Sequence, residues 1–166
     1  MTLSNLNSSI EPEPSGRELF SEIRALIDGA KQRAAIAINA EITLLYWQVG
    51  LRIQSEILHD RRAEYGKHII VQLSERLTQA YGRGWSEKQL RHCVHLVETF
   101  PDEQIVSTLR RQLSWTHLKT LMYMDDGLKR DFYIELAQLE RWSVRQLQEL
   151  QEAIAIARRR LPDLSE

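Results

Sequence analysis

Two histidines and the single cysteine of the chain are the closest grouping of residues that could do chemistry. In the segment SEKQLRHCVHL, His92 and His95 are three residues apart, which would place both imidazoles on one face of a helix. A zinc site needs three or four ligands, and neither a third histidine nor a suitably spaced carboxylate accompanies this pair. Cys93 falls on the apolar side of the same helix, as a buried thiol would. We therefore expect no metal site and no nucleophile here.

The other candidates for catalysis lack partners. His117 follows Trp115, but no nucleophile that it could activate can be named, so we expect a packed or surface histidine. Asp125 and Asp126 precede a predicted helix, where carboxylates commonly cap free backbone N–H groups. The chain has no phosphate-binding glycine loop, dinucleotide-binding glycine pattern, His-Glu-x-x-His motif or Gly-x-Ser-x-Gly motif. The sequence thus predicts no enzyme and no cofactor.

Composition limits the classes of protein that need to be considered. The chain has 166 residues, of which 43% are hydrophobic, enough for one domain with a core. Its net charge is −1, so binding to a polyanion would require a local basic surface. A single cysteine fits a reducing compartment. Because the N-terminus is polar and no run of about 18 apolar residues occurs, we expect a cytoplasmic protein without a membrane segment.

Apolar residues recur at steps of three or four along almost the whole chain, which predicts an all-α, multi-helix fold. The first stripe covers residues 19–58. At about 1.5 Å per residue, one such helix would be roughly 60 Å long, so we expect either a long N-terminal helix with a bend near Gly29 or an antiparallel helical hairpin. Further helices are expected at about residues 64–81, 86–99, 103–112, 115–124, 127–140 and 144–161.

The same pattern predicts how the chain is divided. Residues 1–16 are rich in Ser, Asn, Pro and Glu and are expected to form a disordered arm. Residues 17–162 should form a single all-helical domain, since neither an internal repeat nor a second domain boundary is found. Residues 163–166 are left as a short tail.

A glycine-containing corner joins two of the predicted helices. One helix should end at Gly82, which readily adopts a left-handed conformation, and Ser86 should cap the next while Gln89 reaches back to it. This arrangement is typical of a helix-turn-helix, in which the first turns of the second helix contact DNA bases. Basic side chains surround the corner and can donate hydrogen bonds to phosphates and to guanine. The residues predicted to contact DNA are Arg83, Lys88, Arg91, His92, His95, Arg110 and Arg111.

The long first helix supports an alternative hypothesis. Over residues 42–53 it is apolar on a second side as well, where Leu44, Trp47 and Leu51 lie. A helix of this kind can pair with a copy of itself or with a partner protein. The chain would then be a protein-interaction or oligomerisation module, and its charged residues, 27% of the total, would only keep it in solution.

Several segments, taken in order, resemble one known family. They are NAEITLLYWQVGLRI, EYGKHIIVQLSERL, YGRGWSEKQL, FP, STLRRQLSWTHL, RDFYIELA and RWSVRQLQ, between about residue 20 and residue 150. They are similar to the N-terminal domain of the YhcG family, also called DUF1016. The resemblance implies an all-helical, helix-turn-helix-like domain that usually precedes a PD-(D/E)xK (PDDEXK) nuclease domain. It thereby implies a bacterial DNA-processing protein, with duplex DNA and a PDDEXK nuclease domain or protein as partners.

The sequence departs from this family pattern in two places. Relatives commonly carry Met-Arg and then an aromatic pair where this chain has His92-Cys93 and Leu96-Val97, so no specific base recognition carries over. No Asp or Glu stands two residues before any lysine, so the second half of the nuclease signature is absent and its metal-binding carboxylates cannot be assembled. We therefore predict a non-catalytic module that binds DNA or targets a nuclease.

Overall fold

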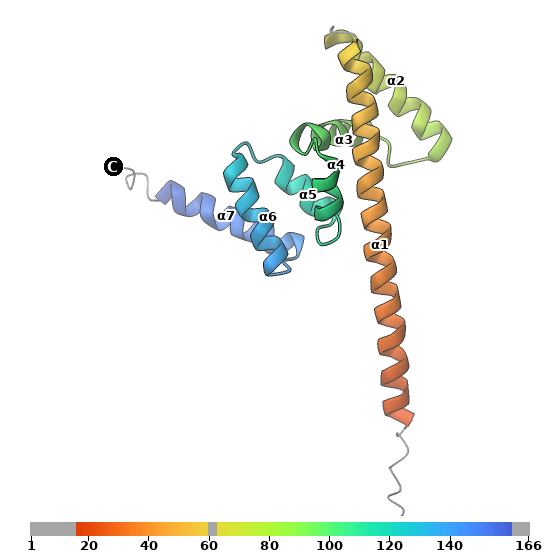
Figure 1. Ribbon diagram of the computed structural model, residues 1–166, viewed down its shortest axis with the longest axis vertical. Coiled ribbons are helices and arrows are strands. Elements are labelled where there is room, and N and C mark those ends of the chain that lie inside the picture. Colours follow the sequence, from red (N-terminus) through yellow and green to blue (C-terminus); the bar gives the residue numbers. More distant parts are fainter. Residues whose placement is uncertain (1–15, 60–62, 161–166) are drawn as a thin grey trace, which may run out of the picture. The chain divides into compact units, whose positions relative to one another are not determined.

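The computed structural model describes residues 16–59 and 63–160, and every regular element in these ranges is an α-helix. The prediction of an all-α fold is therefore confirmed. The predicted arm and tail lie outside the described residues, apart from Gly16, where the first helix begins. The helices are α1 (Gly16–His59), α2 (Ala63–Tyr81), α3 (Glu87–Thr99), α4 (Glu103–Leu109), α5 (Trp115–Met122), α6 (Gly127–Leu139) and α7 (Val144–Arg160) (Figure 1).

The first helix, α1, is a single helix of 44 residues. It continues through Gly29 without a turn, so the expected hairpin is wrong and the long-helix alternative is confirmed. One glycine inside a helix costs only about 1 kcal/mol relative to alanine. The alanines that follow it, among them Ala30 and Ala34, are the strongest helix formers, and they outweigh this local cost.

Contacts within the chain divide it into two compact units, residues 1–35 and residues 36–166. The described part of the first unit, residues 16–35, consists of the beginning of α1 alone. The second unit contains the remainder of α1 together with α2 to α7. The core and the candidate site both belong to the second unit.

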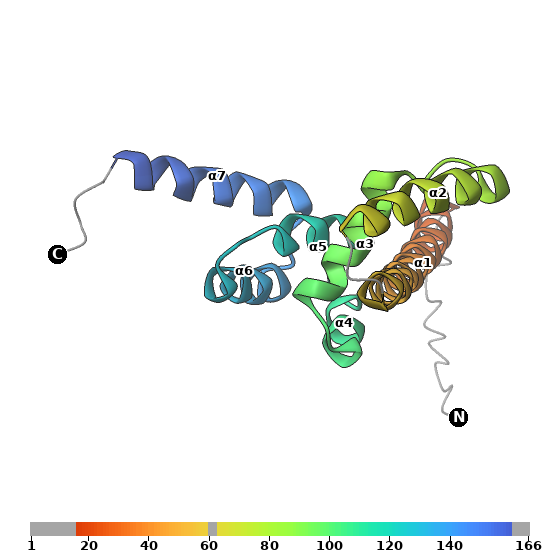
Figure 2. The ribbon, with the colours of Figure 1, turned by 90° about the horizontal axis from the view of Figure 1, so that it is seen from above.

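Helices α3 and α5 are at the centre of the second unit. Helix α3 packs against α2 and α5, and α5 also packs against α6 and α7 (Figures 1 and 2). The main core lies where α1 and α3 to α7 meet, and a smaller cluster of Ile53, Ile70 and Leu90 joins α1, α2 and α3. Completely buried members of the main core include Leu96, Val106, Leu118, Leu121 and Leu147.

Helix α1 comes into close contact with α3 at a glycine. A Cβ atom at Gly50 would overlap the backbone carbonyl of Cys93 and would lie 3.0 Å from Val97 Cγ2. About one turn earlier in α1, Trp47 donates its indole N–H to the carbonyl of Phe100 at 2.8 Å. Only glycine permits this contact, which brings the indole within reach of the C-terminal end of α3.

Helix starts agree with the caps that the sequence predicts. Ser86 Oγ accepts a hydrogen bond from Gln89 N at 3.2 Å, and Asp126 accepts from two N–H groups at the start of α6. The predicted return bond from the side chain of Gln89 is wrong, because Gln89 Nε2 is directed at Cys93 Sγ, 3.9 Å away. Cys93, facing the core one turn later, offers this amide a partly buried acceptor.

Helix α1 is also long and apolar enough to cross a membrane by length and composition alone, and no other helix in the described ranges is. Core helices and signal sequences satisfy the same two criteria. In this chain Trp47, Gly50 and Ile53 of α1 are buried in the protein core. The helix therefore gives only weak support for a membrane segment.

Candidate nucleic-acid interface

The corner between α2 and α3 is built from glycine backbone and a packed tryptophan. Gly82 and Gly84 adopt φ angles of 81° and 118°, in the left-handed region that favours glycine. Ser74 of α2 donates its hydroxyl to the carbonyl of Trp85 at 2.8 Å, and the Trp85 ring meets Tyr46 edge-on at 5.9 Å. These contacts fix the start of α3 against α2 and α1.

Helix α3 presents its basic residues on the side away from the core. Leu90 and Cys93 are completely buried, and Lys88 and Arg91 are exposed. Arg91 forms a surface ion pair with Glu87 at 3.2 Å. Exposed pairs of this kind contribute about 0–1 kcal/mol, so a phosphate can compete for the guanidinium.

The two histidines of α3 contact the end of α5 rather than solvent alone. His95 stacks on Tyr123 with ring centroids 4.5 Å apart, and His92 Nδ1 lies 2.5 Å from the Tyr123 hydroxyl. His95 Nε2 donates to the carbonyl of Met122 at 2.8 Å, and its Nδ1 is 3.3 Å from Glu98 Oε2. Both imidazoles are thus held in place by the α3–α5 packing.

Positive charge gathers around His92. Burial lowers the pKa of His92, and the positive charges of Lys119, Lys88 and His95 lower it further. His92 is therefore neutral at pH 7, and the two lysines beside it carry positive charge. Neither lysine forms an ion pair with any residue in the described ranges. We call Lys88, His92, His95, Lys119 and Tyr123 the α3–α5 cluster.

Of the three remaining predicted DNA contacts, one is bonded to another helix and two are exposed. Arg110 donates to the carbonyl of Ala40 at 3.0 Å and to Glu41 Oε1 at 3.2 Å, so it ties the end of α4 to α1. Arg83 and Arg111 are exposed and form no ion pair within the part of the chain that is described. Arg83 and Arg111 therefore stay predicted phosphate contacts, whereas Arg110 already has a role in the fold.

The residues predicted for a partner interface lie in different surroundings. Trp47 is only 4% exposed and packs in the core of its own chain, so in this structure it has no surface to offer a partner. Leu44 is half-buried, and Leu51 is 39% exposed. Trp47 is therefore used by the fold itself, whereas Leu44 and Leu51 stay predicted partner contacts.

Two members of the α3–α5 cluster, Lys119 and Tyr123, could not be identified from the sequence. Both come from the end of α5, about 30 residues after α3. Their spacing of four residues places them on one side of that helix end, but spacing within one helix does not show which other helix it meets. Only the packing of α3 against α5 brings the end of α5 next to the histidines of α3.

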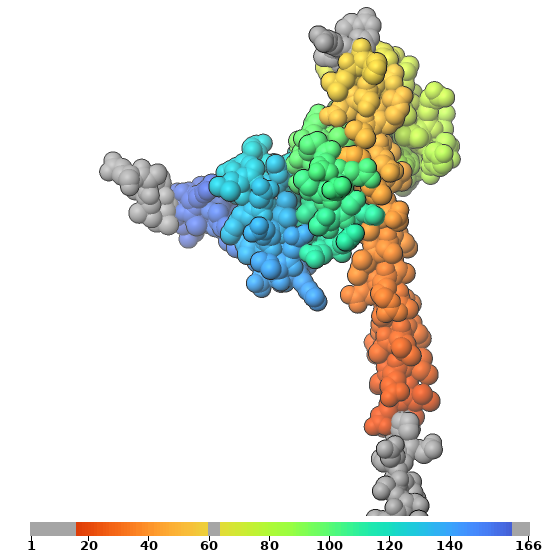
Figure 3. Space-filling model, in the orientation of Figure 1, coloured from red at the N-terminus to blue at the C-terminus, as the bar shows by residue number. Residues whose placement is uncertain are grey.

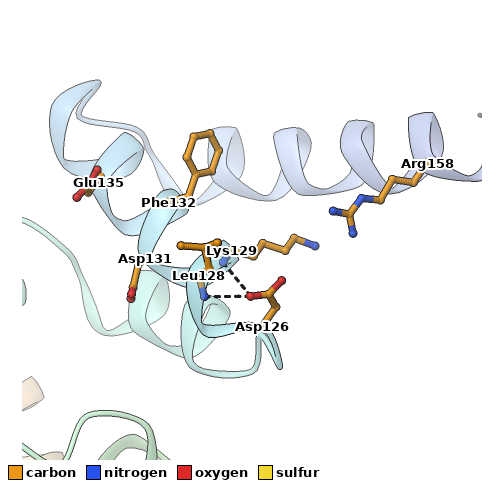
Figure 4. A pocket seen from close by; sticks show the side chains of 7 residues that line it. All are labelled: Asp126, Leu128, Lys129, Asp131, Phe132, Glu135 and Arg158. Carbon is orange, nitrogen blue, oxygen red and sulfur yellow. Dashed lines mark hydrogen bonds between the residues drawn. The ribbon is translucent and has the colours of Figure 1, made fainter. Parts of the chain in front are cut away.

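A cavity of about 510 Å³ lies over α6 and α7, away from the cluster (Figure 4). Arg158 reaches toward it from α7, while the other lining residues come from α6 and its cap. Asp126 is occupied as the cap, accepting from Leu128 N and Lys129 N at 3.0 and 3.2 Å. The lining residues are Asp126, Leu128, Lys129, Asp131, Phe132, Glu135 and Arg158. With three carboxylates against two cations, this cavity is unfavourable for phosphate.

Groups that could perform catalysis are dispersed or occupied. Within residues 16–59 and 63–160, no three His, Cys, Asp or Glu side chains come together to hold a metal ion. Burial raises the pKa of the Cys93 thiol to about 12, which removes its nucleophilic form at neutral pH. His117 is 9% exposed and is packed, as predicted. Its Nδ1 accepts from Ser114 N at 3.1 Å, and its Nε2 donates to the carbonyl of Trp142 at 2.8 Å.

Comparison with known proteins gives one family and one curated relative. The family model described as the DUF1016 N-terminal domain matches residues 22–158. A protein of Escherichia coli (strain K12) named "Putative nuclease YhcG" is 31% identical over 99 residues, which are 59% of this chain and 26% of that protein. The chain therefore matches about a quarter of the length of this relative. No solved structure matches.

Proposed function

The chain belongs to the DUF1016 N-terminal domain family, and from that membership and its basic surface we propose that it is a non-catalytic module that binds duplex DNA for a nuclease. The family is associated with a nuclease through the E. coli relative. As a bacterial protein of this kind it would act in the cytoplasm, where the DNA is. A PDDEXK nuclease domain or protein is the partner that this proposal requires.

The observation that carries the proposal is the gathering of unpaired lysines in the α3–α5 cluster. Lys88 lies one turn before His92 in α3, Lys119 lies one turn before Tyr123 at the end of α5, and His92 is hydrogen-bonded to Tyr123, so the two lysines come from neighbouring helix faces. Two cations without carboxylate partners are suited to adjacent phosphates. Tyr123 is 51% exposed beside them, and because its hydroxyl is hydrogen-bonded to His92 and its ring stacks on His95, it offers DNA the exposed remainder of its ring.

The corner before α3 supports the same function. In a helix-turn-helix the second helix places its first turns against the duplex, and Lys88 and Arg91 occupy those turns here. Arg83, exposed at the corner, would contact the phosphate backbone next to them. A local basic surface of this kind would attract DNA even though the net charge of the chain is −1.

Binding to a fluorescently labelled duplex, followed by anisotropy at several salt concentrations, tests the proposal. Wild type should bind with an affinity that falls as salt rises. The Lys88→Ala/Lys119→Ala variant should bind at least about tenfold more weakly and lower the slope of log affinity against log salt by about 2, roughly 0.9 per lost phosphate contact. Absence of binding by the wild type at low salt would contradict the proposal.

A matched control separates a specific surface from general charge. The Lys129→Ala/Arg158→Ala variant removes the same two charges from the acid-lined cavity over α6 and α7. It should keep the wild-type salt slope. If both double variants weaken binding equally, the lysines of the α3–α5 cluster are not a binding site. Incubation of the wild type with plasmid DNA and Mg²⁺ should leave the plasmid uncut, and cleavage would refute the non-catalytic role.

A further inference from the structure

The beginning of α1 carries an apolar stripe that no element of its own unit covers. Within residues 16–35, α1 is the sole element in the described part of the chain (Figure 3, red to orange). One face of this segment carries four large apolar residues, and each is 46–72% exposed. They are spaced four, three and one residues apart: Leu19, Ile23, Leu26 and Ile27. A continuous exposed apolar stripe of this kind marks an interaction site.

Most helical stability in proteins comes from the packing of an amphipathic face, and within their own unit the described residues 16–35 have no other element to pack against. Residues 16–35 therefore gain from a partner that covers Leu19, Ile23 and Leu26. We propose that this partner is a second copy of the same chain, with the two α1 stripes paired in antiparallel. This inference is independent of the proposed DNA-binding function.

The sizes of the side chains make the stripe complementary to itself. Its first half is built from large residues such as Leu19 and Ile23, and its second half contains Ala30 and Ala34. An antiparallel pair centred between Leu26 and Ile27 would set Leu19 opposite Ala34 and Ile23 opposite Ala30 of the second copy. Large residues then face small ones on both sides of the centre, and at the centre Leu26 meets Ile27 of the second copy.

Charged residues along one side of the stripe also favour the antiparallel orientation. Glu22 and Arg33 are eleven residues apart, about three turns, and project from the same side of the helix. In an antiparallel pair this flank meets its own copy, so Glu22 lies near Arg33 of the second copy. On the other flank, Arg24 is paired with Asp28 at 3.6 Å, which reduces its repulsion toward Lys31 of the second copy.

The charge balance of this segment favours a copy of itself over a membrane surface. A helix that lies on a membrane carries mainly Lys and Arg on its polar face. Here the cations and anions nearly cancel, so neither anionic lipid nor a strongly charged protein is favoured. The cations of residues 16–35 are Arg17, Arg24, Lys31 and Arg33, and the anions are Glu18, Glu22 and Asp28.

Sedimentation velocity of the full chain over a range of concentrations tests the pairing. Wild type should form a dimer, and Leu26→Glu and Ile23→Glu should each give a monomer at concentrations where wild type is dimeric. The control Leu128→Glu, at an 82% exposed apolar position on α6, should stay dimeric. Tryptophan fluorescence should show the same core unfolding in all variants. A wild type that remains monomeric, or a dimer that survives Leu26→Glu, would overturn the proposal.

A charge exchange tests the orientation. Glu22→Arg alone and Arg33→Glu alone should each raise the dimer dissociation constant about tenfold, because each places like charges in contact. The double variant Glu22→Arg/Arg33→Glu should return it to within about twofold of wild type. If the double variant is no stronger than the single ones, the antiparallel arrangement is refuted.

Discussion

Replacing Gly50 with alanine should destabilise the protein, although alanine is the better helix former. The added methyl group would overlap the carbonyl of Cys93 and press on Val97 Cγ2 at 3.0 Å, so α1 and α3 would have to separate. Separation would also stretch the 2.8 Å hydrogen bond from Trp47 to Phe100. The same substitution at Gly29, in the same helix, meets only the movable end of Arg33 at 3.3 Å.

The magnitude follows from three opposing contributions. Helix propensity favours alanine by about 1 kcal/mol. Overpacking against backbone costs about 1–3 kcal/mol or more, and a weakened buried hydrogen bond costs about 1 kcal/mol. The net effect of Gly50→Ala should be a loss of about 1–3 kcal/mol in the free energy of unfolding. For a chain of this size that corresponds to a fall in Tm of about 3–10 °C.

Urea unfolding followed by tryptophan fluorescence measures this loss, since Trp47 is buried beside the glycine. The midpoint should fall for Gly50→Ala. Gly29→Ala should leave it unchanged or raised, and should increase helicity measured by circular dichroism, since alanine stabilises a helix by up to about 1 kcal/mol. If Gly50→Ala matches or exceeds wild type, the close approach of α1 to α3 is wrong.

Three further substitutions or reactions test individual contacts. Trp47→Phe leaves the carbonyl of Phe100 without its donor and should lower the free energy of unfolding by about 1–3 kcal/mol in the same urea assay. Cys93 is buried with a pKa raised to about 12, so a thiol reagent at pH 8 should modify it only after unfolding in urea, and fast reaction of the native protein would contradict its burial. Because the pKa of His92 is lowered in the folded state, the unfolded chain takes up the proton first as pH falls through about 6.5. Stability should therefore decrease from pH 7.5 to pH 5.5, and His92→Gln should make that decrease smaller, as urea midpoints at the two pH values would show.

The helices were predictable because their signals are local. Apolar steps of three or four, together with caps such as Ser86 and Asp126, place six of the elements to within a few residues. The length of α1 was left open because Gly29 permits a turn without requiring one. A local signal cannot decide between two structures when the residue concerned tolerates both.

The surroundings of individual side chains were less predictable, because they depend on contacts distant in sequence. Trp47 reads equally as a partner contact or as core, since its apolar surface does not identify what covers it. His92 and His95 were predicted as DNA contacts, but their positions are set by Tyr123, 31 residues after His92. Gly50 gave no signal in the sequence, because the group that it accommodates belongs to another helix.

The hydrogen bond from Trp47 to Phe100 has a consequence for the order of events during translation. Its two residues are 53 positions apart, so α1 leaves the ribosome well before the helix that covers its tryptophan has been made. At about 5–20 residues per second, that interval is several seconds. During this time Trp47 and Ile53 are exposed on the nascent chain, where they offer an apolar site to chaperones. Packing of the later helices onto α1 removes that site, because Trp47 is part of the main core and Ile53 packs with Ile70 and Leu90.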